Sequence, residues 1–200
     1  MNDKERNMSN AKATVTATIR SEHRSLAAVI HGIKALSEDA HSSRREPDFA
    51  LLWRMLYYVE AFPDSVHHPN EDRYLFARVR DRSPTAAPVL EELERQHHDG
   101  PAKLNDIRIA LGHYEAGVSG TSAALVTAVD RFADFYWRHM AMEERELLPL
   151  AEASLSDADW EWVAAGFTGN DPLHPSAQTA DFWRLLQEIV QRAPAPLGFG

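Results

Sequence analysis

The chain has no cysteine among its 200 residues. This absence excludes disulfide bonds, iron–sulfur clusters, thiolate metal sites and cysteine nucleophiles. Long apolar runs are also missing, since no stretch approaches the roughly 18 apolar residues that a membrane-spanning helix needs. A metal ion bound by this chain would therefore need imidazole and carboxylate ligands.

Clusters of basic residues are missing as well. The 21 Lys and Arg are outnumbered by 30 Asp and Glu, which gives a formal net charge of −9. Phosphate contacts need clustered cations, so we expect neither nucleic acid nor a membrane surface as a partner. The polar N-terminal residues lack the apolar core and the cleavage site of a secretory signal. These absences predict a cytoplasmic protein.

Apolar residues recur at helical spacing through most of the chain. The pattern predicts four long helices, and prolines at positions 63 and 69 should kink or restart the second of them. Two shorter helices should follow, the first of them capped by Ser156, with a turn at 169–172 between them. The expected ranges of the six helices are about 14–39, 49–82, 86–111, 121–153, 157–167 and 178–190.

No segment shows the alternating pattern of a β-strand. Four long helices with short connections predict an all-α fold, an antiparallel up-down-up-down four-helix bundle with extra C-terminal helices packed outside it. The corresponding division of the chain is a flexible N-terminus over 1–13, the bundle over 14–153, a C-terminal helical appendage over 154–192 and a flexible tail over 193–200.

Ten histidines are many for this length, and several are clustered. His67 with Glu71, and His139 with Glu143, form two His-x-x-x-Glu pairs on the second and fourth predicted helices. Residues four apart on a helix project about 40° apart, so each pair can grip one ion from a single face. Such pairs would be costly in a core unless a cation neutralised them. His68 lies about 100° from His67 with Glu71 between them, so all three side chains can converge.

The other two long helices also offer imidazoles. His23 lies among apolar residues of the first helix, and the third helix carries the adjacent residues His97 and His98, between which the spacing leaves the choice open. Six or seven such ligands suit two ions of iron or manganese, whereas structural zinc usually takes fewer ligands and some thiolate. Further acidic residues are either partners that orient the histidine ligands or solvated surface charges: Asp72, Glu144 and Glu146. The remaining histidines are expected to be surface or core residues: His31, His41, His113 and His174.

Four stretches of the chain resemble the hemerythrin family, in its bacterial HHE cation-binding branch. They are Ile19–Leu26, Phe62–Phe76, Leu93–His97 and His139–Pro149, and their order and spacing match the family. The resemblance favours His97 over His98. It implies two non-haem iron ions with an oxo or hydroxo bridge, or manganese or zinc in their place. The metal ligands that it implies are His23, His67, Glu71, His97, His139 and Glu143, with His68 as an extra ligand.

The sequence of the third predicted helix differs from that of the respiratory hemerythrins, which this chain resembles elsewhere. They carry a His-x-x-x-His pair there, whereas Gly100 and Pro101 follow His97 and His98 in this sequence. The departure argues against oxygen carriage and leaves coordination positions for water, peroxide or nitric oxide. Iron–sulfur repair relatives are disfavoured because they typically carry an N-terminal cysteine.

We therefore expect a non-haem di-iron protein that senses, stores or scavenges O₂, peroxide, nitric oxide or iron through an open coordination site. The alternative is a di-iron peroxidase-like or oxygenase enzyme. The expected partner is a small diatomic ligand or peroxide, and a homodimer is compatible with the sequence.

Overall fold

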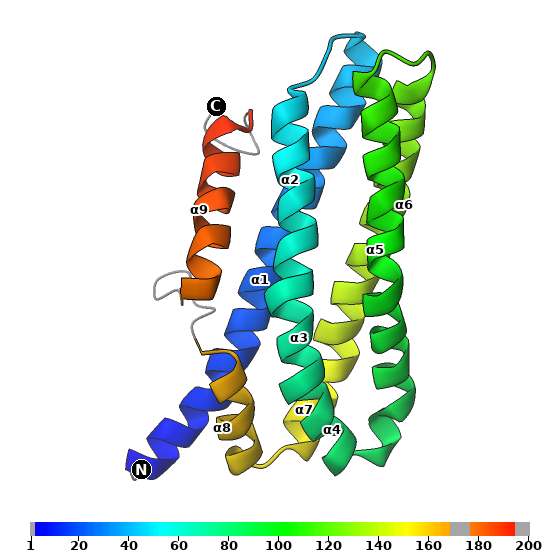
Figure 1. Ribbon diagram of the computed structural model, residues 1–200. Helices are drawn as coiled ribbons and strands as arrows, with labels where there is room; N and C mark the ends of the chain where they lie inside the picture. The colour runs from blue at the N-terminus through cyan, green and yellow to red at the C-terminus, as the bar shows by residue number, and fades with distance from the viewer. Residues whose placement is uncertain (1–2, 169–176, 195–200) are drawn as a thin grey trace.

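The computed structural model describes residues 3–168 and 177–194, and every regular element in these ranges is helical. The long helices lie side by side (Figure 1). None of the helices in these ranges combines the length and the apolarity needed to cross a membrane. The long elements are α1 (Asp3–Ser43), α2 (Phe49–Phe62) with its continuations α3 (His68–Asn70) and α4 (Ala77–Arg82), α5 (Ala87–Glu115), and α6 (Thr121–Met142) with its continuation α7 (Leu148–Ser154).

The first helix begins earlier than the apolar periodicity predicts, at Asp3 instead of about Thr14. Its N-terminal part is held by contacts with the C-terminal half of the bundle, since Val15 is buried and Lys12 forms an ion pair with Glu152 at 3.1 Å. The flexibility expected for 1–13 and 193–200 stays a prediction, and residues 1–2 and 195–200 lie outside the described ranges.

Three π-helical segments join the pieces of the ligand-bearing helices: η1 (Pro63–His67), η2 (Glu71–Phe76) and η4 (Glu143–Leu147). In η1 the backbone N–H of His68 donates to the carbonyl of Pro63, and in η4 that of Leu148 donates to the carbonyl of Glu143. Prolines at positions 69 and 149 follow these segments. Because proline has no N–H and its ring crowds the carbonyl four residues earlier, the α-helical pattern is interrupted there. A short 3₁₀ turn, η3 (Pro84–Ala86), leads into α5.

Two apolar clusters occupy the bundle, and a polar layer lies between them along each long helix. Ile19 of α1 and Leu93 of α5 belong to one cluster. Leu26 of α1 and Leu104 of α5 belong to the other. The side chains between these pairs include the predicted metal ligands. The fold therefore encloses the polar layer with apolar packing on both sides, which excludes water from it.

The C-terminal helices pack outside the long ones, with α8 (Asp157–Gly166) against α1 and α9 (Ala177–Arg192) against α2 (Figure 1). The predicted cap of α8 is confirmed. The hydroxyl of Ser156 accepts from the N–H of Asp159 at 3.3 Å, and the Asp159 carboxylate accepts from the N–H of Ser156 at 3.1 Å. The turn expected at 169–172 and His174 lie outside the described residues.

Candidate metal centre

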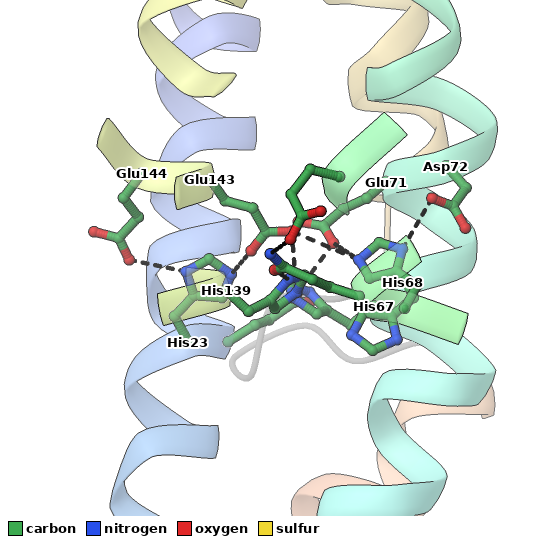
Figure 2. Close-up of polar contacts among 12 residues, drawn as sticks. His23, His67, His68, Glu71, Asp72, His139, Glu143 and Glu144 are labelled. Carbon is green, nitrogen blue, oxygen red and sulfur yellow. Dashed lines mark hydrogen bonds and ion pairs between the residues drawn. The ribbon is translucent and has the colours of Figure 1, made fainter. Parts of the chain in front are cut away.

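All seven residues that the sequence singles out as metal ligands lie in one buried cluster, drawn in close-up in Figure 2. They form two sets whose ligand atoms lie within 4.8 Å of one another: the three-histidine group of His68, His97 and His139, and the two-histidine group of His23, His67, Glu71 and Glu143. His97 belongs to one of these groups, whereas the adjacent His98 is exposed and lies outside both. His31, His41 and His113 are exposed, as expected.

The two carboxylates connect the two groups. One oxygen of Glu143 lies 3.0 Å from Nε2 of His23, and its other oxygen lies 3.3 Å from Nε2 of His139 and 3.7 Å from Nε2 of His97. Oε2 of Glu71 lies 3.5 Å from Nε2 of His67 and 3.8 Å from Nε2 of His97. Each carboxylate therefore faces imidazoles of both groups, as a carboxylate that bridges two ions would.

Four of the five imidazoles are oriented by a hydrogen bond from Nδ1. His23 donates to Glu144 at 2.8 Å (Figure 2). His97 donates to Asp72 at 3.0 Å. Two further bonds join His67 to Glu22 at 2.8 Å and His139 to Gln96 at 3.0 Å. With the proton held on Nδ1, the lone pair of Nε2 points into the cluster, which is the form that binds a metal ion.

Of the three acidic residues considered as orienting partners, Asp72 and Glu144 take that place, while Glu146 is exposed. Two orienting residues are absent from the sequence prediction, Glu22 and Gln96. A signal for Glu22 does exist, because it lies three residues after Ile19 and four before Leu26, on the buried face of α1. Gln96 lies three residues after Leu93 and carries the same kind of signal.

The inner atoms of the cluster have no hydrogen-bond partners. These atoms are Nε2 of His23, His67, His68, His97 and His139 and both carboxylate oxygens of Glu71 and Glu143. A buried polar group without a partner costs about 1–3 kcal/mol, and a charged one costs more. So many inward lone pairs around a shared centre fit cations, and the oxygen and imidazole donors fit iron or manganese.

The pKa values of the ligands show how burial and neighbouring charges act on the cluster without a cation. Burial raises the pKa of Glu71 well above 4.5, and the negative charges of Glu143 and Glu22 raise it further. For Glu143 burial also acts upward, but the surrounding histidines, His139 foremost, hold its pKa well below 4.5.

Burial lowers the pKa of His139 to about 4 and that of His68 well below 6.5. Burial also acts downward at His23 and His97, but their hydrogen bonds to carboxylates outweigh it and raise both pKa values to about 9. A metal ion would displace the extra proton of these two histidines, because the neutral imidazole is the metal-binding form.

Aromatic rings shield the imidazoles. Phe62 stacks on His67 with ring centres 6.4 Å apart, and Phe76 stacks on His97 at 5.5 Å. From α9, Phe182 contacts Phe62 at 5.6 Å, so the C-terminal helix adds a second layer over the two-histidine group. Tyr136 packs edge-on against His139 at 5.9 Å.

Fold and site together define an all-helical protein with a buried cluster of histidines and carboxylates that could hold metal ions. The family model of the hemerythrin HHE cation binding domain matches residues 14–151. The chain belongs to this family, whose domains bind metal cations, commonly iron. Searches of curated proteins and of solved structures found no match.

Proposed function

We propose that this protein binds two iron ions and senses, stores or scavenges O₂, peroxide, nitric oxide or iron through an open coordination position. The observation that carries the proposal is the pair of ligand groups that share Glu71 and Glu143, with their inner atoms unpartnered. Manganese or zinc could replace iron in the same donor set. We also propose that the four long helices run up-down-up-down and that the protein is located in the cytoplasm.

The open position belongs to the two-histidine group in this proposal. That group offers one imidazole fewer than the three-histidine group, so an ion there keeps room for an outside ligand. Helix α5 contributes only one histidine, His97, to the three-histidine group. In this proposal His68 completes the group as its third imidazole. Bound iron would supply reversible ligand binding and one-electron chemistry toward small oxidants.

The protein residues prepare this chemistry by orientation and by exclusion of water. The orienting acceptors hold the Nδ1 proton of four imidazoles, and the aromatic rings cover their outer faces. Because Glu71 and Glu143 are fully buried, no solvent competes for their oxygens. A change of charge at the ions would be transmitted to α1, α5 and α6 through the same hydrogen bonds.

The test is aerobic purification followed by metal analysis and an optical spectrum, with and without peroxide or nitric oxide. Two irons for each chain, with oxygen-to-iron charge-transfer absorption, are expected. A metal-free protein whose thermal stability does not respond to added iron would contradict the proposal.

A variant sharpens the test. We expect His139→Ala to lose one or both ions and to melt at lower temperature, because ion binding is linked to folding. The matched control is His113→Ala, an exposed histidine on α5 that should leave the metal content unchanged. Unaltered metal content in the His139 variant would refute its assignment as a ligand.

The alternative function is a di-iron peroxidase-like or oxygenase enzyme. One observation favours it: a cleft of about 610 Å³ between α5 and α6 is lined by Gln96, which holds His139. Phe135 and Met142 give the cleft an apolar part, and Arg138 gives it a cation. Turnover of hydrogen peroxide with an electron donor would support the enzyme, whereas a bound but inert adduct would support the sensor.

A further inference from the structure

The acceptors behind the imidazoles differ in charge between the two groups. Both histidines of the two-histidine group donate to a carboxylate. In the three-histidine group only His97 does so, because His139 donates to the neutral amide of Gln96. Nδ1 of His68 lies 4.0 Å from a carboxylate oxygen of Asp64, beyond hydrogen-bond distance.

The amide of Gln96 cannot turn without losing a second hydrogen bond. Its Nε2 donates to Glu92 at 2.6 Å, and Glu92 is held by two hydrogen bonds from Arg95, at 2.9 and 2.6 Å. With the amide nitrogen committed to Glu92, its oxygen must face His139. Gln96 is only 9% exposed, whereas Glu92 and Arg95 lie at the surface and line the cleft between α5 and α6.

A carboxylate acceptor raises the basicity of the imidazole that donates to it, and an amide does so much less. The negative charges of Glu22 and Glu144 also attract a cation directly. Glu71 and Glu143 face imidazoles of both groups, so these two carboxylates do not distinguish the groups. The basicity of the imidazoles and the charge of their acceptors both favour the two-histidine group.

We propose that the two groups fill in order, the two-histidine group first, and that Gln96 is a positioning residue that keeps the three-histidine group the weaker site. This inference rests on the proposed function, because it requires two ions in the cluster. It adds an order of loading and names the residue that sets it.

Titration of the metal-free protein with Co²⁺, followed by absorption and calorimetry, tests the order. Two separable binding steps are expected. A crystal loaded with one equivalent of Co²⁺ should show anomalous scattering between His23 and His67. Density divided equally between the two groups would overturn the proposal.

The role of Gln96 is tested by exchanging amide and carboxylate in the double variant Glu92→Gln, Gln96→Glu. The exchange conserves the net charge and leaves an amide to donate and a carboxylate to accept. We expect the second Co²⁺ to bind about tenfold tighter or more, with the first step unchanged. The control is Glu91→Gln, which removes a carboxylate from an exposed position on the same helix and should leave both steps as they are.

An exchange that alters both steps equally, or neither, overturns the role of Gln96. If the double variant does not fold, Asp72→Asn provides the test, since it makes the acceptor of His97 neutral and should weaken only the second step, by about 10–100-fold. A chain that binds fewer than two ions contradicts the proposed function as well. Two ions bound with equal affinity contradict only the order.

Discussion

Replacing Glu71 by Gln should change stability in opposite directions with and without metal. Glu71 is fully buried, both its oxygens lack hydrogen-bond partners, and the charges of Glu143 and Glu22 oppose its ionisation. The substitution removes a negative charge and keeps the shape of the side chain. In the metal-free protein it should therefore raise the free energy of unfolding.

The amide is itself a buried polar group, so the expected gain is only the additional cost of the buried charge, on the order of 1–3 kcal/mol. For a chain of this length each kcal/mol moves the melting temperature by about 2–4 °C, so the metal-free variant should melt roughly 2–12 °C higher. With metal the sign reverses, because an amide is a poor bridge between two ions. Saturation to 100 times the dissociation constant stabilises by about 2.7 kcal/mol for each site, and the variant should forfeit at least one such contribution.

The assay is thermal unfolding of chelator-treated and of iron-loaded protein, followed by circular dichroism. Glu94→Gln is the matched control, since Glu94 forms a partly exposed ion pair with Arg80 and its loss should cost less than about 1 kcal/mol. The reasoning fails if the Glu71 variant is the less stable protein after chelation, or if it binds two ions as tightly as the native chain.

Two further predictions concern the C-terminal half of the chain. Gly166→Ala should destabilise the protein by about 1–3 kcal/mol in a denaturant titration, because its new Cβ would lie 2.2 Å from the ring of Tyr74, whereas Gly112→Ala has free space and should stabilise helix α5 by about 0.5–1 kcal/mol. Asp159→Asn should cost about 1–2 kcal/mol at pH 7, because Arg82 and the helix cap hold the pKa of Asp159 well below 3.8. A lowered pKa stabilises the folded state above the unfolded value, so the difference from the native chain should shrink as the pH falls below 3.8. A constant difference down to strongly acidic pH would refute it.

The ligands could be predicted from the sequence because their spacing is local. His67 with Glu71, and His139 with Glu143, each lie on one helix, and the helical repeat alone brings the two side chains together. The orienting residues Glu22 and Gln96 could not be assigned in this way. Their hydrogen bonds cross between helices that are far apart in the sequence, so the partner depends on how the helices are aligned.

The start of α1 escaped prediction. Apolar periodicity detects a helix only where one face is buried continuously, and among residues 11–14 only Ala11 packs against an apolar cluster. The interruption predicted at Pro63 and Pro69 is present, but the sequence pattern did not indicate that it takes the form of π-helical segments. A π-helical segment adds one residue to a turn, which breaks the periodicity at the place where it occurs. His68 was predicted to converge with its neighbours on a regular helix, whereas it follows directly on η1.

The π-helical segments set the rotational phase of the ligand helices. In a regular α-helix Leu148 would project about 180° from His139, on the solvent side. The extra residue in η4 turns it back by about 100°, and Leu148 is buried in the core. Phe76, the last residue of η2, likewise lies nine residues after His67, and it is buried in the core. Deleting one residue from either segment would leave a regular helix whose ligands and core residues point in different directions. The metal centre and the apolar layer beside it therefore both depend on the rotation that the extra residue introduces.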